Sequence, residues 1–368
     1  MILKDEKIAS TQMLFLLVTV VSATAFLFVP AITSETAGRD GWISVFFLAT
    51  GFGVTVSLVC ARLGLYFPDQ TIIEYAPQLV GPVLGKTIGL LYFIFFLHVN
   101  AIIVREFGDF LVTAFLPETP LLVFNIVVVM LAASAVRNGF EVVVRMNQFV
   151  FPLFIGVLLI IITLNIGEMN PGNLLPVLER GIKPVILGSL TPSAWRGEVA
   201  VILMLLPYLN KSEEARNTLI IAVLLIAIIL GALIMASTMV FGSLQDSHFM
   251  FPTLELAKYI SLGEFLERVE AVIVIVWVAG ITIKVAVFYL AAVLACAQFF
   301  KVENERPLVY PMGIITLVFS VSMFGNSREL VDFISKVFPI YAFVFELFIP
   351  AFLLLVATIR MRGGRRNA

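Results

Sequence analysis

Ten long apolar runs constrain this chain more than any other feature of its sequence. An α-helix needs about 20 mostly apolar residues to cross a hydrocarbon core about 30 Å thick, because each residue rises about 1.5 Å. The runs lack the alternating pattern of barrel strands, which are also about half as long. We therefore predict an all-α polytopic membrane protein of ten transmembrane helices, built as a single membrane domain over residues 1–368. The ten runs are 12–30, 42–61, 87–116, 121–136, 148–166, 185–209, 218–241, 271–300, 308–324 and 337–359.

The composition excludes several classes of protein. Of the 368 residues, 60% are hydrophobic and 13% are charged, and soluble domains carry roughly 25% charged residues. The net charge of −1 provides no basic surface for a nucleic acid. Cys60 and Cys296 both lie in apolar runs, and the two histidines, His98 and His248, are too few for a metal cluster. We expect no nucleic-acid partner, no metal site and no cofactor.

The basic residues indicate how the chain is oriented. If the N-terminus is cytoplasmic, 14 lysines and arginines fall on the cytoplasmic side, 7 on the outer side and 3 inside the runs, which accounts for all 24. Because positive residues accumulate on the cytoplasmic side, we predict that both termini are cytoplasmic. The basic tail at 360–366 is a stop-transfer anchor or, alternatively, a contact for anionic lipid headgroups.

Two segments between the runs have helical patterns of their own. Residues 253–266, in the second long outer loop, predict an amphipathic helix lying on the surface. Residues 68–85 are too polar to span and predict a helix at the cytoplasmic interface.

Two runs are interrupted at mid-depth. The first carries Ser22, Ala23 and Thr24 there, and the sixth carries Pro192 and Gly197. Proline removes a backbone donor, and glycine favours unwinding. Discontinuous helices in matching positions of two halves are typical of transporter binding sites. We predict that the first and sixth helices are broken, although small hydroxyl residues in the first run also suit helix packing.

Charged residues inside the runs are the next candidates. A charge at mid-bilayer costs about 2.5–3.5 kcal/mol on insertion scales, so it should face the protein interior and be paired. Lys284 lies near the middle of the eighth run. Its ammonium could bind a ligand carboxylate or occupy the site of a coupling cation. The alternative is a structural role, as a buried ion pair with Glu198 or Glu346. Arg105 and Asp109 are one helical turn apart and predict a local ion pair.

Signatures of catalysis are missing from the sequence. No segment has the phosphate-loop spacing G-x-x-x-x-G-K-S/T, because three residues and not four separate Gly81 from Gly85-Lys86-Thr87, and no Ser/His/Asp set has a defensible geometry. We therefore expect neither an enzyme nor an ATP-driven pump.

Segments along nearly the whole chain carry a resemblance to a known family. They are 38–43, 67–75, 85–92, 173–178 with Gly181, 206–211, 265–270, and Trp277 followed by Lys284. In this order and spacing the chain resembles the endospore germination permeases, the B subunits of spore germinant receptors, in the amino acid–polyamine–organocation superfamily. It departs from that pattern in the first run, where the family often has a glycine and this chain has Ser22-Ala23-Thr24.

The resemblance implies a LeuT-type fold of two inverted five-helix repeats, at about 11–167 and 185–360. It also implies a ligand site between the first, third, sixth and eighth helices. Phe95 and Val99 are four residues apart, as are Lys284 and Phe288, so each pair shares a helix face. The candidate ligand-binding residues are Ser22, Ala23, Thr24, Phe95, Val99, Ala194, Trp195, Gly197, Glu198, Lys284 and Phe288.

Two functions follow as hypotheses. The first is a permease-like subunit that senses a nutrient in the spore inner membrane, together with a soluble-domain-bearing A subunit and a lipoprotein C subunit. The second is a stand-alone proton- or sodium-coupled amino acid permease, which would use the same fold. A purely structural scaffold is a third class. A cationic residue in the site favours an amino acid as ligand, and neutral sugars and nucleosides remain open.

Overall fold

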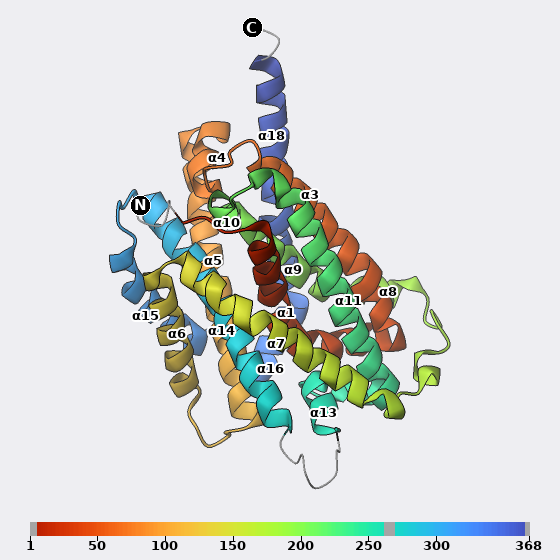
Figure 1. Cartoon of the computed structure of the whole chain (residues 1–368). Coiled ribbons are helices and arrows are strands. Elements are labelled where there is room, and N and C mark those ends of the chain that lie inside the picture. The colour runs from red at the N-terminus through yellow and green to blue at the C-terminus, as the bar shows by residue number, and fades with distance from the viewer. Residues whose placement is uncertain (1–5, 261–268, 365–368) are drawn as a thin grey trace.

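The computed structural model describes residues 6–260 and 269–364, and within these ranges the chain forms helices and no strand. Figure 1 shows a bundle of long helices with both labelled ends of the chain toward one end of the molecule. In these ranges one isolated backbone bridge joins Ile8, just before the first helix, to Leu209.

The longer helices coincide with the predicted apolar runs. They are α1 (Ser10–Ala37), α3 (Thr50–Gly64), α5 (Pro82–Ala114), α6 (Leu121–Asn138), α7 (Phe140–Leu164), α11 (Ala215–Phe241), α14 (Val269–Phe300), α15 (Val309–Ser322) and α18 (Ile349–Gly364). The shorter ones are α2 (Gly41–Ile43), α4 (Ile72–Val80), α8 (Ile182–Gly188), α9 (Leu190–Gly197), α10 (Ile202–Leu205), α12 (Ser243–His248), α13 (Pro252–Lys258), α16 (Ser327–Lys336) and α17 (Phe338–Phe343). Two π-helical segments, η3 (Ser44–Ala49) and η11 (Val344–Phe348), and the 3₁₀ segment η6 (Glu198–Val201) adjoin the functional region.

Seven helical segments in the described part of the chain are long and apolar enough to cross a membrane. The number becomes eight if α15 and α16, which meet at a bend of 99°, count as one span. One of the seven, Ser10–Gly64, covers two of the predicted runs, and the sixth run is divided among short helices. The structure is thus an all-helical membrane bundle.

The predicted break in the first helix is wrong. α1 is continuous from Ser10 to Ala37 and passes through Ser22, Ala23 and Thr24 without interruption. Ala23 packs against Gly280 of α14. A Cβ added at Gly280 would lie 3.8 Å from the Cβ of Ala23, which is van der Waals contact. The small residues of this stretch therefore serve close helix packing, the alternative that the sequence had left open.

The sixth helix is interrupted, but it tightens instead of unwinding. α8 and α9 meet at Ser189, and α9 passes into η6 at Glu198, whose φ of −55° and ψ of −18° remain helical. Pro192 sits in the first turn of α9, where backbone N–H groups have no intrahelical acceptor in any case. The prediction of a break here is therefore confirmed in position but not in form.

Two loop helices differ from their predictions in different ways. The predicted surface helix at 253–266 appears as α13, and its residues Thr253, Leu254 and Leu256 are buried. Residues 261–266 of that prediction lie outside the described residues. α13 packs against α1 and α14, so it is part of the core and not a surface helix. The predicted cytoplasmic helix at 68–85 contains α4, which packs against α5.

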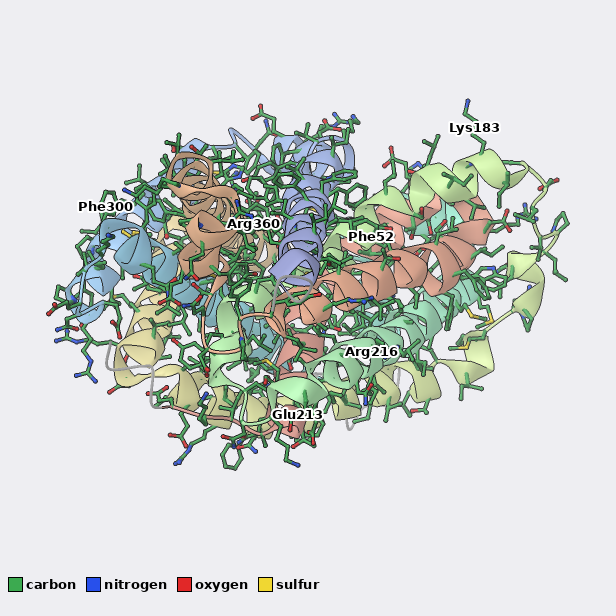
Figure 2. The ribbon with its side chains drawn as sticks, turned by 90° about the horizontal axis from the view of Figure 1, so that it is seen from above. Phe52, Lys183, Glu213, Arg216, Phe300 and Arg360 are labelled. Atoms are coloured by element: carbon green, nitrogen blue, oxygen red, sulfur yellow. The ribbon has the colours of Figure 1, made fainter. Side chains whose placement is uncertain are left out.

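α18 projects beyond the other helices at the end of the bundle where C is marked (Figure 1). It contacts α3 on one side and α4 on the other. Figure 2 looks down on this end and shows Arg360 at the near end of α18, with Glu213 toward one edge of the molecule.

Candidate functional site

Lys284 is the centre of the buried polar network. Its side chain on α14 is fully buried, and Nζ lies 2.8 Å from both carboxylate oxygens of Glu198 in η6. Nζ also donates to Oγ1 of Thr24 on α1, at 2.9 Å. One ammonium therefore holds together the first, sixth and eighth predicted spans. Of the two carboxylates that the sequence offered as partners, Glu198 is the one that pairs.

Thr24 connects this ion pair to the indole of Trp195. Nε1 of Trp195 donates to Oγ1 of Thr24 at 2.9 Å. A hydroxyl has two acceptor lone pairs and one hydrogen, and Lys284 and Trp195 occupy the lone pairs. The hydrogen remains for the carboxylate of Glu106 on α5, which lies beside Thr24. Four helical segments thus meet at one threonine.

A small cavity with aromatic walls lies next to the ion pair. Its volume is ≈ 10 Å³, about the room of one water molecule. Phe95 and Phe345 stack along it with ring centroids 4.4 Å apart, and Tyr92 packs edge-on against Phe345. The lining residues are Tyr92, Phe95, Phe96, Glu198, Ala200, Val201, Phe288, Phe345 and Glu346.

The tenth predicted span has a π-helical segment, η11, where it reaches this cavity. A π-bulge disturbs the regular ladder of backbone hydrogen bonds and is frequent at functional sites. The hydroxyl of Tyr92 donates to the carbonyl of Phe345 at 2.6 Å, within this segment. In η3, Nη1 of Arg196 similarly donates to the carbonyl of Val45 at 3.1 Å. Side chains thus satisfy carbonyls in both irregular segments.

Gly197 brings the backbone of the sixth helix against Glu346. A Cβ added at Gly197 would overlap the carboxylate of Glu346 and come within 3.1 Å of the ring of Phe52. Only glycine lets the two elements approach this closely without a shift. The sequence predicted that Gly197 allows the sixth helix to unwind. In the structure Gly197 instead allows close packing against Glu346.

The structure brings some of the predicted site residues together and leaves others apart. Thr24, Trp195, Glu198 and Lys284 form one hydrogen-bonded network. Phe95 and Phe288 line the adjoining cavity, and Gly197 abuts it through Glu346. The other four predicted residues are buried but do not line that cavity: Ser22, Ala23, Val99 and Ala194.

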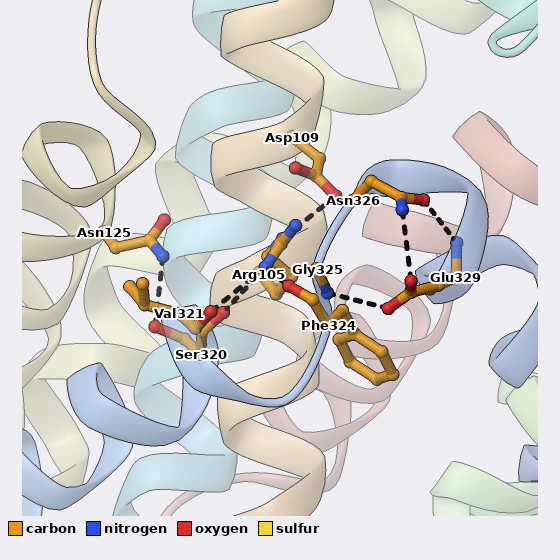
Figure 3. Close-up of polar contacts among 9 residues, drawn as sticks. All are labelled: Arg105, Asp109, Asn125, Ser320, Val321, Phe324, Gly325, Asn326 and Glu329. Atoms are coloured by element: carbon orange, nitrogen blue, oxygen red, sulfur yellow. Dashed lines mark hydrogen bonds and ion pairs between the residues drawn. The ribbon is translucent and has the colours of Figure 1, made fainter.

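Arg105 and Asp109 form the predicted ion pair, with Nε 3.1 Å from Oδ2. Figure 3 shows a second role for Arg105, whose Nη1 donates to the carbonyl of Phe324 at 2.7 Å, beyond the end of α15. Beyond this point Asn326 caps α16 by accepting from the backbone N–H of Glu329. Arg105 therefore supports the bend between α15 and α16, which is a structural role.

Sequence reasoning missed four residues of this region as site members: Tyr92, Glu106, Phe345 and Glu346. Glu346 was visible as a charge deep in the tenth run, and Glu106 as a charge in the third. Tyr92 and Phe345 carry no such signal, because aromatic residues are common throughout these runs.

Solved transporter structures share this arrangement of helices. MhsT in complex with L-phenylalanine aligns with a TM-score of 0.67 over 94% of this chain and 97% of that chain, at 14% identity. Mhp1, a nucleobase-cation-symport-1 family transporter with bromovinylhydantoin bound, aligns with a TM-score of 0.64 over 90% of this chain and 75% of that chain, at 14% identity. The chain therefore has the LeuT-type fold.

Curated relatives match along almost the whole length. Spore germination protein KB of Bacillus subtilis is 28% identical and covers 99% of this chain and 98% of its own. Spore germination protein YndE of Bacillus subtilis is 25% identical over 98% of this chain and 99% of its own, and spore germination protein XB of Bacillus anthracis is 22% identical over 87% and 88%. The model of the family described as "Spore germination protein" matches residues 7–328. The chain therefore belongs to the spore germination protein family.

Proposed function

We propose that this chain is the permease-like subunit of a spore germinant receptor and binds a small nutrient at mid-membrane. The observation that carries the proposal is the buried network of Lys284, Glu198, Thr24 and Trp195, which joins three spans of a transporter fold beside an aromatic cavity. Intramembrane ionisable groups are costly and usually functional. The ligand-binding role of the eleven predicted residues belongs to this proposal.

The proposal includes ten spans arranged as two inverted repeats of five helices. α1 and the segment formed by α2, η3 and α3 supply two spans within Ser10–Gly64, and α8 to α10 supply the sixth. Two ends of the chain on one side of the bundle agree with an even number of spans (Figure 1). With the excess of Lys and Arg on that side, both termini are cytoplasmic, and the membrane is the spore inner membrane.

Ligand access is from the outer side, through a cavity of ≈ 270 Å³ between α1, α12 and α16. Phe28, one helical turn beyond Thr24 on α1, is in its lining, together with Glu35 and Arg328. Opposite charges at this position suit the two ends of a zwitterionic amino acid. MhsT, a neighbour in fold, holds L-phenylalanine, and an amino acid is the ligand class that we propose here.

Binding would require the helices to separate, because the inner cavity has room for about one water. A ligand carboxylate would compete with Glu198 for the ammonium of Lys284. A ligand that binds the separated arrangement more tightly shifts the population toward it. The A and C subunits of the receptor would read that shift, which makes the response allosteric.

The test replaces Lys284 with Met in the spore. We expect the nutrient response to be lost or redirected, with the protein still present in the membrane. Lys336→Met, at an outer lysine that is 72% exposed, is the matched control and should leave the response unchanged. An unaltered dose response of the Lys284→Met spores would remove Lys284 from the ligand site.

The fold shared with transporters also supports a second function, a stand-alone proton- or sodium-coupled amino acid permease. Uptake of radiolabelled amino acids into proteoliposomes that contain only this chain would favour it. Adjacent genes for the other two receptor subunits would favour the sensor. A thermal-shift screen with amino acids, sugars and nucleosides identifies the ligand in both cases, because a ligand of the folded state alone raises its stability.

A further inference from the structure

The carboxylate of Glu346 is buried with no hydrogen bond to its oxygens from the described residues. Its residue is 1% exposed, and within the described residues neither oxygen has a hydrogen-bond partner. Transfer of an unpaired carboxylate from water to an apolar interior costs tens of kcal/mol by simple solvation estimates, so such a group is neutralised instead. The side chain needs a proton or a bound cation.

The groups that face Glu346 do not supply the missing positive charge. Lys284 of α14 lies on the same side, but both oxygens of Glu198 already hold its ammonium. The remaining neighbours are acidic or neutral: Glu198 itself, the Cys60 thiol of α3 and the phenol of Tyr92 on α5. Arg196, the next residue before Gly197, turns away and donates to Val45 and Thr50.

The deeply buried charges lead to the same conclusion when they are counted together. Three cations, Arg105, Arg196 and Lys284, are buried in the third, sixth and eighth predicted spans. Four carboxylates, Glu106, Asp109, Glu198 and Glu346, are buried in the third, sixth and tenth. One negative charge is in excess, and Arg196 donates only to Val45 and Thr50. Among these four carboxylates, Glu346 is the one whose two oxygens both have no hydrogen-bond partner in the part of the chain that the structure describes.

We propose that Glu346 is a proton-binding site, held as a neutral carboxylic acid against Gly197 when the cavity is closed. Glu198 and Glu346 line the same cavity, which has room for about one water. Separation of the sixth and tenth spans would admit water and release the proton, and closure would take it up again. The π-helical segment that carries Glu346 provides the irregular backbone that such a movement can use.

The proposal is independent of the ligand, because the proton can be observed with no ligand present. Infrared spectroscopy of the purified chain in nanodiscs detects the C=O stretch of a neutral carboxylic acid, which shifts in heavy water. We expect this band in the wild type, its loss in Glu346→Gln, and its retention in Glu106→Gln. Glu346→Asp keeps an acid at the site and should shift the band, which covers the case in which Glu346→Gln does not fold.

A sodium ion is the competing occupant, and a second measurement separates the two. Thermal unfolding is compared in sodium chloride and in choline chloride at equal ionic strength, and we expect no difference. A rise in stability specific to sodium and lost in Glu346→Gln would overturn the proposal. So would a wild type without the neutral-acid band, or a band that remains in full in Glu346→Gln. None of these results depends on whether a nutrient binds at Lys284.

Discussion

The hydroxyl of Thr253 donates a 2.6 Å hydrogen bond to the backbone carbonyl of Phe26. This carbonyl lies four residues before Pro30, which has no N–H to offer it within α1. α13, an outer-loop helix, thus satisfies the backbone of the first span at the one place where proline leaves it open. The bond explains why α13 is buried and why α1 passes Pro30 without ending.

Replacement of Thr253 by Val should lower the free energy of unfolding by about 1–3 kcal/mol, because it leaves a buried carbonyl unsatisfied. The measurement is thermal or denaturant unfolding in detergent. In a Pro30→Ala background the N–H of residue 30 can bond Phe26, so the same change should cost less. Equal costs in the two backgrounds would contradict this account of the bond.

Thr24→Val removes the acceptor shared by Trp195 and Lys284 and should also cost about 1–3 kcal/mol of stability. Thr19 is a matched control, since it is a buried threonine on the same helix whose hydroxyl has no partner among the described residues. Thr19→Val should be nearly neutral. Similar losses in both variants would show that Thr24 acts by packing alone.

Breaking the central ion pair from one side should be more costly than removing it. Lys284→Met or Glu198→Gln alone leaves a buried polar group unpaired and should destabilise by about 3–5 kcal/mol. The double variant Lys284→Met/Glu198→Gln should recover much of that loss. A double-mutant cycle on unfolding measures the coupling, and strict additivity would argue against the pair.

Gly197→Ala places a methyl group where the carboxylate of Glu346 lies. Overpacking of this kind costs about 1–3 kcal/mol, and shortening the opposing side chain in Gly197→Ala/Glu346→Ala should restore part of it. Gly156→Ala on α7 is the control, because nothing lies within 4 Å of the added Cβ. The Gly156→Ala variant should be as stable as the wild type or more stable by up to about 1 kcal/mol, because alanine has the higher helix propensity.

Asp246 of α12 should make the stability of the outer side of the protein depend on pH. It accepts hydrogen bonds from Ser34 of α1, at 2.5 Å, and from Ser237 of α11. Burial raises the pKa of Asp246 from the ordinary 3.8 to about 6, against the opposing effect of the two serines. Between these values the folded chain holds more protons than the unfolded chain, so stability falls as pH rises through this window.

Hydrogen exchange of the α12 amides should therefore be slowest, after correction for intrinsic rates, at the acidic end of that window. It should quicken across the window and level off above about pH 6, where Asp246 is ionised in the folded chain as well as in the unfolded chain. Asp246→Asn cannot ionise and should remove the dependence. A wild type and an Asn variant with parallel pH profiles would exclude Asp246 as its source.

The sequence by itself determined the features that depend on neighbours along the chain. Apolar runs long enough to span the hydrocarbon core predicted the helices, because membrane thickness and hydropathy act on each segment separately. The Arg105–Asp109 pair was predictable because one helical turn separates the two residues. The positions of Lys284 and Glu346 near the middle of their runs could also be read from the sequence, because depth in a run is a count of residues from its ends.

Only the tertiary structure decided how these segments meet. It selected Glu198 over Glu346 as the partner of Lys284, kept α1 continuous through Ser22–Thr24, and placed Glu346 against Gly197. Each of these outcomes depends on which helices approach within a few ångströms of one another. Packing between segments far apart in the chain sets those distances, and no local pattern of residues records them.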